Sequence, residues 1–170
     1  DNEGNGWRSG HVRIYQNNSG TWQQIGSDID GEAANDESGL SVSLSSDGSV
    51  VAIGGYRNNG NGTDSGHIRI YKNQSGSWQQ IGSDIDGEAA DDGFGYSVSL
   101  SSDGSVVAIG AYGNSGNGTE SGHVRIYQNN SGTWQQVGSD IDGEAAGDES
   151  GLSVSLSSDG SVVAIGGYRN

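Results

Sequence analysis

The sequence has no proline, cysteine or methionine, and its apolar residues never form a long uninterrupted run. Without cysteine the chain cannot form disulfides or thiolate metal sites, so it gives no sign of its redox compartment. No run approaches the roughly 20 apolar residues that cross a bilayer, which predicts no membrane insertion. Basic residues are few as well, with 7 against 22 acidic ones and a formal net charge of -15. This charge repels phosphate backbones, so no nucleic acid partner is expected.

The residues that are present favour a folded β protein. Glycine accounts for 32 of the 170 residues, and the apolar residues occur in short β-branched blocks at regular intervals. A solvated low-complexity tail would not need such blocks. The chain begins with Asp1 rather than methionine, which predicts a processed product or a piece of something longer.

A repeat with a period of 56 residues runs through the sequence. His11, His67 and His123 begin nearly identical runs, and residues 11–58 differ from residues 123–170 only at Ile25/Val137 and Asn35/Gly147. Self-similarity at this spacing indicates a propeller, a solenoid or an array. We expect one repeat domain, 1–170, with repeat units 1–56, 57–112 and 113–168.

Each period contains four strand signals, which we call a, b, c and d in chain order. YSVSLSS (96–102) alternates apolar residues with serines, whose small side chains predict close packing on that face. SVVAIGAY (105–112) is continuously apolar, which predicts burial on both faces. Between them Asp103-Gly104 predicts a tight turn with positive φ at both central residues. HVRIYQN (123–129) and, after NSG, TWQQVGSDI (133–141) supply strands c and d.

These signals predict an all-β fold of tandem four-stranded antiparallel β-propeller-type blades. Because such a sheet has two apolar faces, it needs neighbouring sheets to cover them, as propeller blades do. The order along the chain places whole blades at about 38–84 and 94–140, with half blades at both ends. Closed propellers have about four to eight blades. We therefore expect a second chain or further repeats to complete the half blades, in a closed ring or a helical filament.

The stretch GFGYSVSLSSDGSVVAIGAYGNSGNGTESGHVRIY (93–127) resembles the FG-GAP repeats of integrin α-subunit propellers. Phe94-Gly95 matches the FG element, and AIGAY (108–112) stands at the GAP element. The resemblance covers all three units, although the others have Ser38-Gly39 and Ser150-Gly151 in place of Phe-Gly. It implies a propeller-type blade and an adhesive or structural role that is extracellular or at the cell surface.

An acidic stretch, GSDIDGEAA, occurs unchanged at 26–34, 82–90 and 138–146, where strand d of one unit leads into strand a of the next. With a following aspartate it reads D-x-D-G-E-x-x-x-D, and hard oxygen ligands beside a turn glycine suit Ca²⁺, the one candidate cofactor. The calcium site of FG-GAP repeats lies instead in the hairpin between the first two strands, which here is only SSDGS. The alternative is Asx-type turns at the junction. The candidate ligands are Asp28, Asp30, Glu32, Asp36, Asp84, Asp86, Glu88, Asp92, Asp140, Asp142, Glu144 and Asp148.

Glycosylation sequons, N-x-[ST], recur at two loop positions. Because asparagine, serine and glycine are common in turns, such sequons also arise without being used. Their recurrence nevertheless predicts N-glycosylation if the chain enters a secretory pathway. The candidate sites are Asn17, Asn73 and Asn129 in the c–d turn, and Asn61 and Asn117 in the b–c loop.

Nothing in the sequence proposes a reaction. The three histidines have no neighbouring histidine or cysteine, so we interpret them as strand-start residues with local hydrogen bonds. Trp22, Trp78 and Trp134 could stack on sugars, but their place at a strand start favours packing between blades. Serines abound without a G-x-S-x-G elbow, and we expect no enzyme.

The expected function is therefore that of a non-catalytic extracellular structural or adhesive repeat protein. Its partner would be itself, with blades assembling head to tail between chains into a glycosylated polymer or filament. The alternative is a closed oligomeric propeller that acts as a lectin-like or calcium-dependent binding module for glycans.

Overall fold

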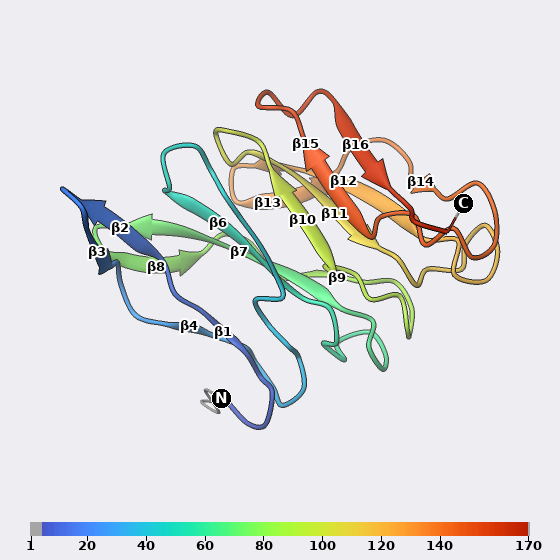
Figure 1. Ribbon diagram of the computed structural model, residues 1–170, viewed down its shortest axis with the longest axis horizontal. Coiled ribbons are helices and arrows are strands. Elements are labelled where there is room, and N and C mark those ends of the chain that lie inside the picture. Colours follow the sequence, from blue (N-terminus) through green and yellow to red (C-terminus); the bar gives the residue numbers. More distant parts are fainter. Residues whose placement is uncertain (1–4, 170) are drawn as a thin grey trace.

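The structure, a computed structural model, describes residues 5–169 and is built from short strands and turns (Figure 1). The all-β prediction is confirmed. The expected domain, 1–170, extends beyond the described residues at both ends. No helix in the described part is long and apolar enough to cross a membrane.

Two complete antiparallel sheets form the middle of the molecule, each with its strands in the order a, b, c, d. In both sheets strand d is split into two short strands that pair with the same strand c. The first sheet comprises β5 (Ser41–Leu44), β6 (Val50–Gly55), β7 (His67–Gln74), β8 (Ser77–Gln80) and β9 (Ile85–Asp86). The second comprises β10 (Ser97–Leu100), β11 (Val106–Ala111), β12 (His123–Asn130), β13 (Thr133–Gln136) and β14 (Ile141–Asp142).

Half sheets flank the complete ones and lie at opposite ends of the stack in Figure 1. Positions c and d of the first half sheet are β1 (His11–Val12), β2 (Tyr15–Asn18), β3 (Thr21–Gln24) and β4 (Ile29–Asp30). Positions a and b of the last one are β15 (Ser153–Leu156) and β16 (Val163–Gly166). Strand c is continuous in β7 and β12 but interrupted between β1 and β2, where no strand b among the described residues pairs with its other edge.

The turn between strands a and b differs from the prediction. Gly104 has a φ of 71°, but Asp103 is not among the residues with positive φ, so the expected pair of left-handed residues is wrong. Instead Gly104 N–H donates to Ser101 O at 3.0 Å, and the Asp103 carboxylate accepts the Ser105 N–H at 3.0 Å. The carboxylate therefore holds a type I turn that is followed by a left-handed glycine.

Strand d also differs from the continuous strand that was predicted over 133–141. Val137 N–H still bonds Ile126 O, and Ile141 pairs with Val124, but the residues between them bulge out of the sheet. Gly138 permits this with a φ of 76°. The bulge, with its equivalents in the other units, places Asp28, Asp84 and Asp140 outside the ladder.

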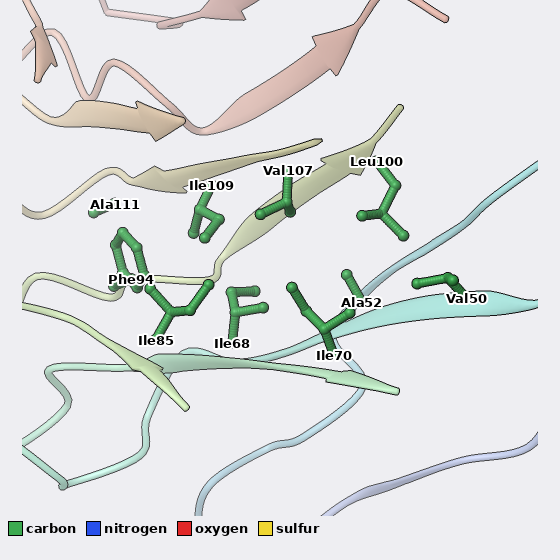
Figure 2. Close-up of a cluster of buried hydrophobic side chains, with 10 residues drawn as sticks. All are labelled: Val50, Ala52, Ile68, Ile70, Ile85, Phe94, Leu100, Val107, Ile109 and Ala111. Carbon is green, nitrogen blue, oxygen red and sulfur yellow. The ribbon is translucent and has the colours of Figure 1, made fainter. Parts of the chain in front are cut away.

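The buried apolar side chains form two clusters, each of which lies between neighbouring sheets. Successive residues of strand b point to opposite neighbours, so Val50 and Ala52 pack toward the second sheet while Val51 and Ile53 pack toward the first half sheet. Figure 2 shows the cluster between the two complete sheets, where Phe94 is fully buried. The predicted burial of strand b on both faces is confirmed.

The serine face of strand a meets the next unit closely, as predicted. Ser41 Oγ donates to Gly95 O at 2.7 Å, and Leu100 N–H donates to Ser43 Oγ at 2.9 Å. Because β5 and β10 are edge strands, their free backbone groups would otherwise be exposed. The hydroxyls thus join consecutive blades through polar contacts that a larger side chain would prevent.

Candidate functional site at the blade junctions

The repeated acidic stretch begins in the bulge of strand d and ends where the next sheet starts. Its carboxylates do not converge on one point, because each lies in a different local setting. The last aspartate of each motif caps a turn: Asp36 Oδ2 accepts the Ala33 N–H at 2.9 Å, and Asp92 Oδ2 accepts the Ala89 N–H at 3.0 Å. Asp148 accepts the Ala145 N–H in the same way. These three aspartates are buried, and each carboxylate accepts the N–H of the residue three positions earlier rather than that of the residue two positions later, as an Asx turn would require.

The middle aspartates occupy a second setting, in the short strands β4, β9 and β14. A Cβ atom at Gly60 of the b–c loop would lie 3.2 Å from Asp86 Oδ1, so this carboxylate faces that loop. Burial and the neighbouring charge of Asp84 raise the pKa of Asp86. Asp30 and Asp142 occupy the equivalent positions.

Further carboxylates lie around the histidines that start strand c in the two complete sheets. His67 is fully buried, and its Nδ1 lies 3.5 Å from Asp84 Oδ2 and 3.8 Å from Glu32 Oε2. Asp84 comes from the same sheet as His67, whereas Glu32 comes from the preceding half sheet. His67, facing the Asp84 carboxylate, lowers the pKa of Asp84. The three donor atoms lie within 4.8 Å of one another.

The second junction repeats the arrangement with Glu88, His123 and Asp140. His123 Nδ1 lies 3.7 Å from Asp140 Oδ2, and burial lowers the pKa of His123. Here Arg125 donates to both oxygens of Asp140, at 2.9 and 2.7 Å, and contacts Glu88. The hydrogen bonds from Arg125 hold the pKa of Asp140 below its usual range. Among the described residues these two groups are the ones whose ligand atoms come together.

Each group of glutamate, histidine and aspartate at a blade junction is called a corner below. The outer copies of this corner are incomplete within the chain. His11 and Asp28 stand at the equivalent positions of the first half sheet, where Arg13 Nε lies 3.1 Å from His11 Nε2 and 3.6 Å from Asp28 Oδ2. Glu144 occupies the glutamate position at the opposite end of the stack.

Sequence reasoning grouped the carboxylates by their nearness in the chain and did not associate the histidines with them. The signal that could have done so is the shared period, because His67, Asp84 and Glu32 each recur 56 residues later. The register of strands c and d, which pairs His67 with Asp86, brings the histidine beside the bulge.

The five sequons fall into two structurally different groups. In the c–d turn the side-chain oxygens of Asn17, Asn73 and Asn129 accept the N–H of the turn glycine at 2.7 to 2.8 Å. In the b–c loop, by contrast, Asn61 Nδ2 donates to Gly87 O at 2.9 Å and Asn117 Nδ2 donates to Gly143 O at 2.8 Å. The amide nitrogen that would carry a glycan is thus already engaged at Asn61 and Asn117.

The tryptophans at the start of strand d pack between blades. Trp78 Nε1 donates to Ile25 O and Trp134 Nε1 donates to Ile81 O, both at 2.9 Å and both in the preceding unit. Their rings border the two apolar clusters. Trp22 has no preceding unit in the chain and is 65% exposed. The interpretation of Trp78 and Trp134 as packing residues is confirmed.

The family model described as the FG-GAP repeat matches residues 84–127, which run from the bulge of the first sheet to strand c of the second. No curated protein matches the chain. FG-GAP repeat families are generally non-catalytic, and they are typical of extracellular, adhesion-type repeat domains.

The match is to one repeat, and the sheet β5–β9 has the same strand order as the sheet β10–β14, to which most of the matched residues belong.

Proposed function

We propose that this chain is a non-catalytic extracellular structural or adhesive protein whose blades assemble head to tail between chains into a filament. The observation that carries this proposal is the complementarity of its two end faces. Each face exposes side chains whose counterparts at the internal junctions are covered. Exposed apolar patches of this kind are typical of interaction surfaces.

The N-terminal face is formed by the first half sheet and strand β5. Trp22 is 65% exposed, and Leu44 is 49% exposed although its counterpart Leu100 is 7% exposed. The C-terminal face, formed by β13, β14 and the last hairpin, shows the same contrast. Val162 is 64% exposed, whereas its counterpart Val50 is 5% exposed. The other large exposed apolar residues of the two faces are Tyr15, Leu40, Val42, Val137, Ile141 and Tyr168.

The internal junctions define how two such faces would fit together. Strand b pairs with strand c in a fixed register, for example Gly110 with Val124. Applying that register between chains would pair Gly166 of one copy with Val12 of the next. The Trp22 indole would then donate to Val137 O, as Trp134 donates to Ile81 O. The fit uses only contacts that the repeat already makes twice within the chain.

A head-to-tail contact of this kind is heterologous, so it generates a filament unless its rotation closes a ring. The two half sheets lie at opposite ends of the stack, which supports extension rather than closure within one chain (Figure 1). Because every copy is the same chain, all junctions between chains along such a filament would be equivalent.

N-glycosylation forms part of the proposal. The amide nitrogens of Asn17, Asn73 and Asn129 have no protein hydrogen bond within the described part of the chain, and these residues lie beside exposed hairpin tips. We expect higher glycan occupancy there than at Asn61 and Asn117. Glycopeptide mass spectrometry of the secreted chain measures this, and equal or reversed occupancy would contradict it.

The test of assembly compares two substitutions that place aspartate on strand b. Val162→Asp alters an exposed residue, so the dispersed chain should keep its stability within about 0.5 kcal/mol. Its assembly should be lost, because a carboxylate would be buried at every junction between chains. Val107→Asp places the charge in a fully buried position of one chain and should unfold that junction before assembly begins.

Light scattering and negative-stain electron microscopy, with circular dichroism as the folding control, read out both variants. Normal filaments from Val162→Asp would show that this face is not the interface. Discrete rings that bind glycans and dissociate in a calcium chelator would support the calcium-dependent binding module instead.

A further inference from the structure

A buried imidazole nitrogen without a hydrogen-bond partner faces two carboxylates at the first blade junction. Both ring nitrogens of His67 lack a hydrogen-bond partner within the described residues, and the ring is fully buried. A buried polar group that is left unpaired is costly, and its retention calls for a physical reason. Its Nδ1 lies 3.5 Å from Asp84 Oδ2 and 3.8 Å from Glu32 Oε2, which belong to two different blades.

We propose that each blade junction binds one divalent transition-metal ion of the Zn²⁺ class, which joins the two blades. The ligands at the first junction are Glu32 Oε2, His67 Nδ1 and Asp84 Oδ2. Those at the second junction are the equivalent Glu88, His123 and Asp140. The glutamate comes from one blade, and the histidine and aspartate come from the next.

The separation of the donor atoms fits such an ion. Zinc bonds to histidine nitrogen and carboxylate oxygen are about 2.0 to 2.2 Å long, which places two ligands of a tetrahedral ion about 3.4 Å apart. The observed distances from His67 Nδ1 are 3.5 Å to Asp84 and 3.8 Å to Glu32. Only a small inward movement of the Glu32 side chain, which is 46% exposed, is required. A water molecule can supply the fourth ligand from that open side.

Neighbouring side chains support the first ligand shell. Gln80 Nε2 donates to Asp84 Oδ1 at 2.6 Å, and Gln136 Nε2 donates to Asp140 Oδ1 at 2.7 Å. In each case the amide fixes the Oδ1 oxygen, and the Oδ2 oxygen lies 3.5 Å from Nδ1 of His67 in Asp84 and 3.7 Å from Nδ1 of His123 in Asp140. Outer hydrogen bonds of this type orient metal ligands.

The donor set also decides between classes of metal. Ca²⁺ takes about six to eight oxygen ligands, and this corner offers two carboxylates and a nitrogen. Imidazole together with carboxylate suits zinc and similar transition metals. The ion inferred here therefore differs from the calcium that the acidic motif alone suggests.

Arg69 and Arg125, which lie beside the two corners, have different partners, so we expect the two sites to differ in their affinity for the ion. Arg69 Nη2 donates to Asp30 O at 2.7 Å, and its Nη1 lies 3.7 Å from Glu32 Oε1, so Asp84 is not bound by it. Arg125 instead holds both oxygens of Asp140. An ion at the second junction must displace that guanidinium, so the first site should bind more tightly.

The same geometry extends to assembly, and this step alone rests on the proposed function. At a junction between chains, Glu144 of one copy would meet His11 and Asp28 of the next. A third site would then form only in the filament. A chelator would weaken this junction between chains. At the junctions within each chain it would remove the ions, but the fold would keep the ligand residues in place.

The experiment uses the untagged 170-residue chain, stripped of metal and kept dilute enough to remain dispersed. Zn²⁺ binding is measured by isothermal titration calorimetry, with Ca²⁺ for comparison, and Co²⁺ reports four-coordinate geometry through its visible absorption. We expect two Zn²⁺ ions per chain. Glu32→Gln should remove the tighter one and Glu88→Gln the weaker one, each affinity falling at least about tenfold.

Glu144→Gln is the matched control, because in the dispersed chain this glutamate has no histidine partner and its loss should leave both ions bound. The glutamates are side chains of exposed loops, so folding should be retained, which circular dichroism checks. Absence of Zn²⁺ binding, equal binding of Ca²⁺, or loss of an ion in Glu144→Gln alone would overturn the inference. A dispersed chain that binds two ions but never assembles refutes the proposed function only. Filaments that form without any Zn²⁺ binding refute the metal sites only.

Discussion

Replacing Phe94 with serine tests the role of the single phenylalanine in the stack. The other two units carry Ser38 and Ser150 at this position, so the backbone accepts the substitution. Phe94 is fully buried in the cluster between the two complete sheets, beside Ile85 and Ala111 (Figure 2). Losing a buried phenylalanine side chain costs about 3 to 5 kcal/mol. A buried hydroxyl without a partner adds about 1 kcal/mol or more.

We therefore expect the junction to lose about 4 to 6 kcal/mol, and the loss to be local because each repeat contacts only its neighbours. Amide hydrogen exchange measures this directly. Opening should become at least about a thousandfold more frequent in β7 and β11, since 1.4 kcal/mol corresponds to a factor of ten. The matched control is Ser38→Ala, which removes a buried hydroxyl that has no partner and should be neutral or slightly stabilising. A loss below about 1 kcal/mol in Phe94→Ser would refute the account of this core.

Two further predictions concern single polar contacts. Trp134→Phe removes the indole N–H donated to Ile81 O, so the free energy of unfolding measured by chemical denaturation should fall by about 1 to 2 kcal/mol. Trp22→Phe should leave the stability of the dispersed chain unchanged, because Trp22 is 65% exposed. Equal effects of the two substitutions would contradict the packing role of Trp134. Backbone and side-chain hydrogen bonds from Ser49, with one from the Ser45 side chain, lower the pKa of Asp47 from 3.8 to about 2. Because the pKa of Asp47 is lower in the folded protein than in the unfolded chain, the ionised carboxylate stabilises the fold. This stabilisation is fully present above the unfolded-state pKa of 3.8 and is lost as the pH falls through the folded-state pKa of about 2. Asp47→Asn should thus be less stable than the parent chain at neutral pH and equal to it near pH 2, and a difference independent of pH would contradict this.

Much of the fold could be predicted from the order of apolar and polar residues along the chain. The β-branched run of strand b and the serine alternation of strand a each correspond to a strand of the structure at nearly the expected residues. Two local features were not predictable from the pattern. The Asp103 side chain competes for backbone donors and changes the turn type, and the residues around Gly138 leave the ladder although their sequence reads as one strand with Thr133 and Ile141.

The candidate site was less accessible to sequence reasoning, because its residues come from different blades. Asp84 reaches His67 through the bulge of strand d in the same sheet, and Glu32 meets them only when two sheets stack. Sequence proximity instead grouped Asp84 with Asp86, which the bulge and the following strand direct into different surroundings. The contact of Asp92 with the Ala89 N–H does not depend on the glycine that follows it, because Asp36 and Asp148 make the same contact with a glutamate next in the chain.

Cryo-electron microscopy of the 170-residue chain, under conditions in which it assembles, tests the head-to-tail contact between chains. We expect a filament in which every blade has four strands and composite blades pair β16 of one copy with β1 and β2 of the next. In that composite blade Gly166 should lie opposite Val12, the register found between β11 and β12. Particles that remain single chains, or contacts that leave the β16 edge unpaired, would contradict it.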